Sequence, residues 1–192
     1  MEIPFAKLRK AGFFSEYAEL NDEELQNELK KKRKAQYSAL MGYDYEPGDY
    51  TWLPQLLAED KQKFLDIDLE ADVCAGNNVY VSLITDFSAA SNGHFLPADI
   101  TETWQSEEGP IHVTFSCNGT RVSFEPEYID DWIDGQIFTV INNEMQKVSN
   151  EKFLVCYGPN EEWFGQNIIH IRLTHEEKQW LENDLHWVFP EE

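Results

Sequence analysis

Three aspartates in the middle of the chain have the spacing of a metal site. Asp130, Asp131 and Asp134 would lie on one helical turn, and carboxylate oxygens are ligands that Mg²⁺ and Ca²⁺ prefer. At a helix N-terminus, the same residues would also be stabilised by the helix dipole. We favour this second explanation and assign no metal ligand. A metal-dependent hydrolase that uses these carboxylates with His112 or His170 stays as the alternative.

The other reactive side chains form no recognisable catalytic motif. The five histidines include no H-x-x-x-H pair, and none lies near a cysteine at zinc spacing. His112 and His170 both fall in predicted strands and could be neighbours in one sheet. Cys74 follows an acidic run, which would raise its pKa and weaken it as a nucleophile. Because the chain also has no G-x-S-x-G, P-loop or G-x-G-x-x-G sequence, we predict no catalytic residue and no cofactor, and lean towards a non-enzymatic function.

The charge of the chain limits its partners. The net charge is −21, and residues 37–192 hold 7 Lys and Arg against 29 Asp and Glu. Binding to nucleic acid relies on Lys and Arg that neutralise phosphates, and anionic membranes attract the same residues, so we exclude both partners. Such a polyanion attracts a basic protein surface. Solubility is a simpler reason for an acidic surface, and on charge alone we rank it first.

Aromatic and acidic residues are concentrated in a turn-rich segment, residues 43–52, around Pro47-Gly48. Aromatic side chains dominate contact energies wherever they are used. Their simpler role here would be to cover the edge of the domain's own core, and we rank that role first. A second group, in residues 161–165, looks exposed. If the chain has a partner-binding surface, its predicted residues are Tyr43, Tyr45, Tyr50, Trp52, Asp130, Asp131, Asp134, Glu161, Glu162 and Trp163.

Cysteine usage and the N-terminal residues predict a cytoplasmic protein. Cys74, Cys117 and Cys156 are scattered and odd in number, and the last two lie in apolar strand patterns, as reduced core cysteines do. The N-terminus lacks the basic and apolar regions of a signal peptide. No stretch approaches the ~18 uninterrupted apolar residues of a membrane-spanning helix.

The clearest structural motif is a β-hairpin in residues 111–124. Apolar and polar residues alternate on both sides of Asn118-Gly119, a dipeptide preferred in type I′ turns because both central residues need positive φ. A two-residue turn pairs Phe115 with Val122 and places the apolar side chains on one face. Apolar residues at helical spacing then predict a helix that begins at the aspartates 130–134, extends to residue 148 and covers this face.

Residues 1–42 are predicted to form a helical N-terminal region, separate from a domain of residues 43–192. Asn21 is a candidate N-cap followed by carboxylates, and Gly42 would end the helix. This helix has a thin apolar stripe and five consecutive basic residues, 30–34. We interpret the basic run as a solvated face, docked on the protein's own acidic body, in preference to a nucleic-acid contact.

The rest of the chain supplies the other elements of one α+β domain. The fold that we expect has about five mostly antiparallel strands in one sheet, with helices packed on one face, and a tail near residue 187 that packs back on the sheet. The apolar patterns and a capping box predict helices at residues 56–65, 79–90 and after Thr174, strands at 100–104, 152–157 and 167–173, and an edge strand or loop at 66–73.

Four phrases in the last two-thirds of the chain resemble uncharacterised bacterial proteins of this size: Glu70-Ala71-Asp72-Val73-Cys74, Gly109-Pro110-Ile111, Asp130-Asp131-Trp132 and Leu173-Thr174-His175-Glu176-Glu177-Lys178. In type, the chain resembles immunity proteins of bacterial polymorphic toxin systems, which are small, acidic, aromatic-rich α+β domains of the cytosol. That resemblance implies a protein that neutralises a basic toxin by binding it. We therefore expect a non-enzymatic domain that binds a basic protein surface, with carboxylates at the rim and aromatic anchors at the centre.

Overall fold

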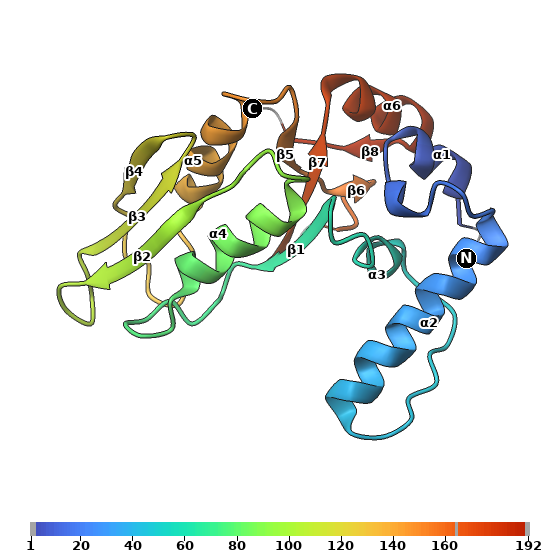
Figure 1. Cartoon of the computed structure of the whole chain (residues 1–192), viewed down its shortest axis with the longest axis horizontal. Helices are drawn as coiled ribbons and strands as arrows, with labels where there is room; N and C mark the ends of the chain where they lie inside the picture. Colours follow the sequence, from blue (N-terminus) through green and yellow to red (C-terminus); the bar gives the residue numbers. More distant parts are fainter. Residues whose placement is uncertain (1–2, 164, 191–192) are drawn as a thin grey trace. The chain divides into compact units, whose positions relative to one another are not determined.

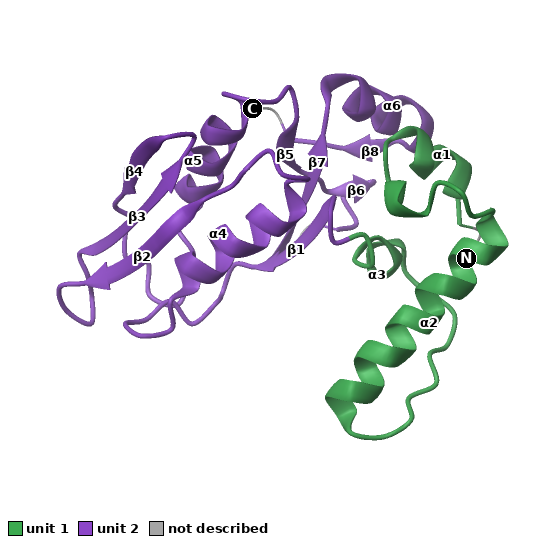
Figure 2. Ribbon diagram, viewed as in Figure 1, with its two compact units in different colours: residues 1–60 green, residues 61–192 purple. Residues whose placement is uncertain are grey.

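The computed structural model describes residues 3–163 and 165–190 of the chain and has an α+β fold (Figure 1). Contacts within the chain divide it into two units, residues 1–60 and 61–192 (Figure 2). The first unit contains α1 (Phe5–Lys10), the 3-10 helix η1 (Ser15–Tyr17), α2 (Asp22–Met41) and α3 (Leu53–Leu57). The second unit contains β1 (Phe64–Asp68), α4 (Val79–Ala90), β2 (Ala98–Trp104), β3 (Ile111–Cys117), β4 (Thr120–Phe124), α5 (Gln136–Met145), β5 (Lys152–Val155), β6 (Gly158–Pro159), β7 (Asn167–Leu173), α6 (His175–Leu185) and β8 (Trp187–Val188).

Helix α2 begins and ends where its capping residues predict. The side-chain oxygen of Asn21 accepts hydrogen bonds from the backbone N–H groups of Glu23 and Glu24, both at 3.0 Å, and the Glu24 carboxylate accepts one from the Asn21 N–H. Gly42 ends the helix with φ 72°, a left-handed conformation that glycine adopts at little cost. The predicted helix is therefore confirmed.

The basic run of α2 pairs with acidic residues of the segment that follows the helix. Lys30 forms an ion pair with Asp49, and Lys34 forms ion pairs with Asp44 and Glu46. These contacts return the chain along α2, so residues 43–60 belong to the first unit. The boundary of the units therefore differs from the one that we predicted after residue 42.

The Asn118-Gly119 hairpin forms in the predicted register. Phe115 of β3 pairs with Val122 of β4, and the two turn residues have φ values of 50° and 74°, as a type I′ turn requires. Strand β2 joins the other edge of β3, which gives a three-stranded antiparallel sheet in the order β2-β3-β4. The apolar residues of β3 are all buried, so one face of this sheet belongs to the core.

The prediction of one sheet of about five strands is wrong. Besides β2-β3-β4, the described residues form a three-stranded antiparallel sheet in the order β1-β7-β5 and a two-stranded sheet of β6 and β8. The strand predicted at residues 167–173 is confirmed as β7, the central strand of its sheet, whereas β5 is an edge strand. Apolar alternation locates a strand and its buried face, but it does not say which distant edge the strand pairs with. That choice depends on how the helices pack.

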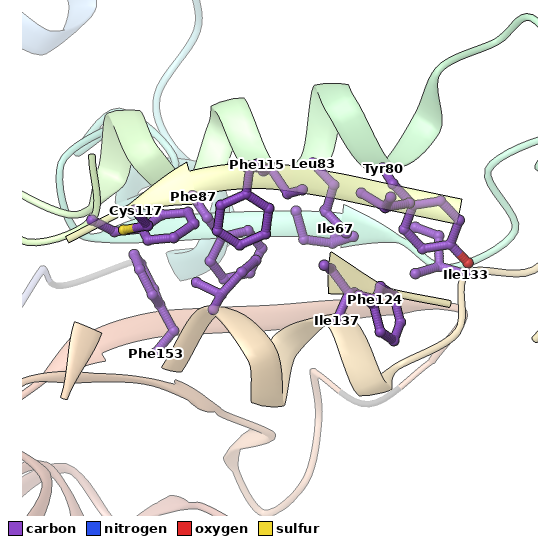
Figure 3. Packing of buried hydrophobic residues seen from close by; sticks show 14 of the residues in the cluster. Ile67, Tyr80, Leu83, Phe87, Phe115, Cys117, Phe124, Ile133, Ile137 and Phe153 are labelled. Atoms are coloured by element: carbon purple, nitrogen blue, oxygen red, sulfur yellow. The ribbon is translucent and has the colours of Figure 1, made fainter. Parts of the chain in front are cut away.

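The core of the second unit lies between α4 and α5 and between the inner faces of the two larger sheets (Figure 3). Phe87 of α4 meets Phe153 of β5 edge-on, with ring centroids 4.7 Å apart. Ile137 and Ile141 of α5 are fully buried in the same cluster as Phe115, so α5 covers the hairpin's apolar face as predicted. Each side chain of this size stabilises the fold by roughly 1.5–3 kcal/mol when buried.

Two predicted helices have different boundaries in the structure. Helix α5 begins at Gln136 and not at the aspartates, because Asp130 has a φ of 53°, which a right-handed helix does not allow. The helix predicted at residues 56–65 corresponds to the shorter α3. Phe64 already belongs to β1, where it pairs with Ile171 of β7.

The C-terminal part follows its local signals. Thr174 and Glu177 form the predicted capping box: the Thr174 hydroxyl accepts from the Glu177 N–H at 3.2 Å, and the Glu177 carboxylate accepts from the Thr174 N–H at 3.0 Å. The tail then forms β8, which pairs with β6. Trp187 of β8 is buried, so the tail packs against the protein through a small sheet of its own.

Candidate protein-binding surface

Two acidic segments of the second unit lie side by side, one after β1 and one after β4. The Ala71 N–H donates to the Asp131 carbonyl at 2.9 Å, and the Ile133 N–H donates to the Leu69 carbonyl at 2.9 Å. These bonds bring together exposed carboxylates that are distant in the sequence. They form what we term the acidic surface: Asp68, Glu70, Asp72, Glu127, Asp130 and Asp131.

Large apolar side chains are exposed within the acidic surface. The exposed fraction of Trp132 is 40% and that of Ile129 is 44%, and Trp132 forms backbone bridges to both Glu70 and Ile129. Tyr128, next to them, packs edge-on against Trp104 with ring centroids 5.8 Å apart. Interface hot spots have this composition, in which aromatic anchors are surrounded by a polar rim.

Hydrogen bonds hold the aromatic pair of Trp104 and Tyr128 in place. The Trp104 indole N–H donates to a Glu102 carboxylate oxygen at 2.9 Å, and the other oxygen of Glu102 accepts from the Tyr80 N–H at the start of α4, also at 2.9 Å. Loss of hydration and then the charge of Asp130 raise the pKa of Tyr128, and the Tyr128 hydroxyl donates to an Asp130 carboxylate oxygen at 3.5 Å. The Trp104–Tyr128 pair is therefore tied to the start of α4 through Glu102.

A pocket of about 370 Å³ borders the acidic surface. The carboxylates of Asp66 and Asp68 accept hydrogen bonds from Asn167 at 2.8 Å and from Gln166 at 2.9 Å. Burial raises the pKa of Asp86. Carboxylates around one hollow attract a cationic side chain such as lysine or arginine. The four aspartates that line this pocket are Asp66, Asp68, Asp72 and Asp86.

Asp134 has a structural position and does not belong to the acidic surface. Its side chain is buried, and its carboxylate accepts hydrogen bonds from the backbone N–H groups of Glu127 and Gln136, both at 2.9 Å. The Asp134 N–H donates to the Tyr80 hydroxyl at 3.0 Å. These bonds fix the loop between β4 and α5, so Asp134 is not accessible to a partner, in contrast to Asp130 and Asp131.

The arrangement of the histidines does not support the metal-site alternative. Within residues 3–163 and 165–190, no group of three or more His, Cys, Asp or Glu side chains is placed to hold a metal ion. His112 and His170, which could have been neighbours in one sheet, are not neighbours, because they lie in β3 and β7 of different sheets. The Nδ1 atom of His112 lies 3.4 Å from a Glu125 oxygen, whereas His170 is buried.

The segment after β6 is less exposed than its sequence indicates. Trp163, which we expected to be exposed, is buried, and its ring meets that of Trp187 with centroids 4.8 Å apart. Glu161 and Glu162 are exposed. Phe164 lies outside the described residues. Trp163 is thus a packing residue of the β6–β8 sheet and is not accessible as an anchor.

The aromatic segment of the first unit is exposed only in part. Tyr43 and Trp52 have exposed fractions of 59% and 48%. Tyr45 is half-buried and stacks on a tyrosine of α2 with ring centroids 5.1 Å apart. Tyr50 is buried, and the Arg33 guanidinium lies 5.0 Å from its ring centroid. The simpler role of these residues, packing within their own unit, applies to Tyr45 and Tyr50.

Trp132 and Ile129 are the residues of this surface that the sequence interpretation missed. The pattern placed Trp132 inside a predicted helix, whereas the structure places it in the loop before α5. A usable signal was present, because Trp132 directly follows Asp130-Asp131. The same combination of acids and aromatics singled out residues 43–52.

Comparison of the chain with protein-family models, with curated proteins and with solved structures finds no match. Among the helices in the described parts of the chain, none has the length and apolar character needed to cross a membrane. A function for this chain is therefore inferred from its own residues.

Proposed function

We propose that residues 61–192 form an acidic protein-binding domain whose partner presents a basic surface. The observation that carries this proposal is the exposure of Trp132 and Ile129 where the two acidic segments meet. Residues 61–192 hold 24 Asp and Glu against 7 Lys and Arg. This charge attracts a basic partner at long range, and the two apolar side chains hold it after contact.

The pocket of four aspartates supplies a second contact for the same partner. Asp68 and Asp72 belong both to the acidic surface and to the pocket wall, so one partner can cover both features. A lysine or arginine of the partner enters the pocket while its apolar residues pack on Trp132. Arginine and aromatic residues are enriched in interfaces for these two kinds of contact.

A toxin domain is the kind of partner that fits this chemistry, in line with the resemblance to immunity proteins. A nuclease presents a basic surface because its substrate is a polyanion. An acidic domain that covers this surface neutralises the enzyme by occupying it, without any catalysis of its own. The proposal therefore comprises a non-enzymatic, cytoplasmic protein that requires no metal or cofactor.

Capture of the partner from native cells tests the proposal. We expect the full chain to retain a basic protein, Trp132→Ala to weaken its binding at least about tenfold, and Asp131→Lys to weaken it through repulsion. Leu96→Ala is the matched control, since Leu96 is also a large exposed apolar residue of the second unit but does not belong to the acidic surface. Its affinity should equal that of the unchanged chain.

Calorimetry with the purified partner tests the electrostatic part. The Kd should rise steeply between about 0.05 and 0.5 M NaCl, because salt screens charges that face solvent. An affinity independent of salt, or one unchanged in Trp132→Ala, would contradict the proposal.

A further inference from the structure

A second pocket of the same unit is separate from the acidic surface and shares no lining residue with it. Its volume is about 460 Å³, and it lies between α5, β5 and the chain at residues 189–190. Small-molecule sites commonly have volumes of about 300–1,000 Å³ and mostly apolar walls. The walls here include Phe138, Phe153, Leu154, Val155 and Phe189.

His170 lines this pocket and lacks a hydrogen-bond partner. Its exposed fraction is 1%, and neither ring nitrogen has a partner among the described residues. Burial lowers the pKa of His170 to about 3, so the ring is neutral at pH 7 and offers one N–H donor and one acceptor. A buried polar group without a partner destabilises the folded protein. A polar ligand in the pocket would remove this cost.

Hydrogen bonds fix the frame of the pocket, and an aromatic ring of its wall packs against the imidazole. The Asn142 side chain bonds both backbone groups of Phe153, donating to its carbonyl at 2.9 Å and accepting from its N–H at 2.8 Å. The Phe138 ring lies 4.3 Å from the imidazole, centroid to centroid, and is half-buried. Phe138 and His170 thus belong to the same wall of the pocket.

The charge of the pocket is opposite to that of the unit around it. Among the described residues that line it, the charged side chains are two lysines, Lys152 and Lys178. The Lys178 ammonium lies 2.9 Å from a Glu182 oxygen and 5.5 Å from the centroid of the Phe189 ring. An ion pair of this exposure contributes little to stability, so Lys178 can turn towards an anion at little cost.

We propose that this pocket binds a small amphipathic carboxylate. Its apolar body lies against Phe138 and Phe153, and its carboxylate accepts hydrogen bonds from the His170 N–H and the Lys178 ammonium. This site goes beyond the protein-binding function and does not depend on it, since the acidic surface contributes nothing to the pocket.

Calorimetry of the full chain with octanoate tests the site. We expect one saturable site, and binding of octylammonium at least about tenfold weaker, since exchanging the sign of one head group at a charged hydrogen bond costs more than ~1.4 kcal/mol. The negative net charge of the chain favours the cation octylammonium. Tighter binding of octanoate would therefore come from the residues of the pocket and not from the net charge of the protein. Absence of saturable octanoate binding, or equal binding of both ligands, would overturn the proposal.

Single substitutions locate the head group. His170→Phe keeps an aromatic ring among Phe87 and Phe138 but removes both nitrogens, so it should raise the melting temperature of the free protein and weaken octanoate binding about tenfold. Lys178→Ala should also weaken binding about tenfold. Lys61→Ala, an exposed lysine outside the pocket, is the matched control and should bind octanoate as the unchanged chain does.

A blocking variant makes the test independent of the folding of His170→Phe. Thr139 is an exposed residue of α5 that lines the pocket, so Thr139→Trp should fill the space and abolish octanoate binding. Thr85→Trp places the same side chain on an exposed position of α4 outside this pocket and should leave binding unchanged. Octanoate binding that survives Thr139→Trp would lie elsewhere and would overturn the proposal.

Discussion

At the residue scale, burial assigns different roles to aspartates that look equivalent in the sequence. Asp131 is exposed beside Trp132, whereas the Asp134 carboxylate is buried and accepts two backbone hydrogen bonds. An exposed carboxylate contributes to long-range attraction and little to stability. A buried acceptor holds the loop that presents Trp132, so its effect on function is indirect.

Asp134→Ala should therefore destabilise the protein, whereas Asp131→Ala should not. Removal of Asp134 leaves the N–H groups of Glu127 and Gln136 without their acceptor, and such a loss costs roughly 1–3 kcal/mol. The change at Asp131 should stay within about 0.5 kcal/mol. Urea denaturation measures both free energies of unfolding, and equal values for the two variants would show that the buried carboxylate is not structural.

At the element scale, the β6–β8 sheet is built around a close contact between a glycine and an indole. Gly158 has a φ of 69°, and a Cβ atom added to it would lie 2.2 Å from the Trp163 ring. Trp163 also meets Trp187 of β8. The two indoles thus pack against each other at this short sheet, which explains why Trp163 is not available to a partner.

Gly158→Ala should be more destabilising than Gly119→Ala. Both glycines have left-handed φ values, 69° and 74°, so each alanine variant bears the same backbone penalty of about 1–2 kcal/mol. Only the Cβ at position 158 overlaps a neighbour, because nothing lies within 4 Å of the one at position 119. We expect a further loss of at least about 1 kcal/mol for Gly158→Ala, measured by thermal or urea unfolding.

At the scale of the whole second unit, the buried imidazole of His170 couples stability to pH. In the folded protein burial lowers the pKa of His170 to about 3, from an ordinary value of 6.5. Between these two values the unfolded chain binds a proton that the folded chain excludes. The free energy of unfolding therefore falls as the pH is lowered through this window, by up to about 1.4 kcal/mol per pH unit.

His170→Phe should remove this contribution to the pH dependence. Relative to the unchanged chain, the variant should gain about 2 kcal/mol of stability between pH 7.5 and pH 5. Urea denaturation at the two pH values measures the difference, in which the shared contribution of the carboxylates cancels. His112→Phe, a substitution at a more exposed histidine of β3, serves as the control. A parallel pH dependence in His170→Phe and the unchanged chain would show that His170 is not neutral and buried in solution.

The sequence by itself determined the features that depend on neighbours within a few residues. The register at Asn118-Gly119, the caps of α2 at Asn21 and Gly42 and the capping box at Thr174 all follow from local backbone requirements. Three-dimensional packing decided the pairing of β7 with β1 and β5, the burial of Trp163 and His170, and the meeting of the two acidic segments around Trp132. Those features are contacts between residues that are far apart in the chain. A local pattern of apolar residues indicates whether a side chain is buried or exposed, but it does not indicate which distant residue that side chain contacts.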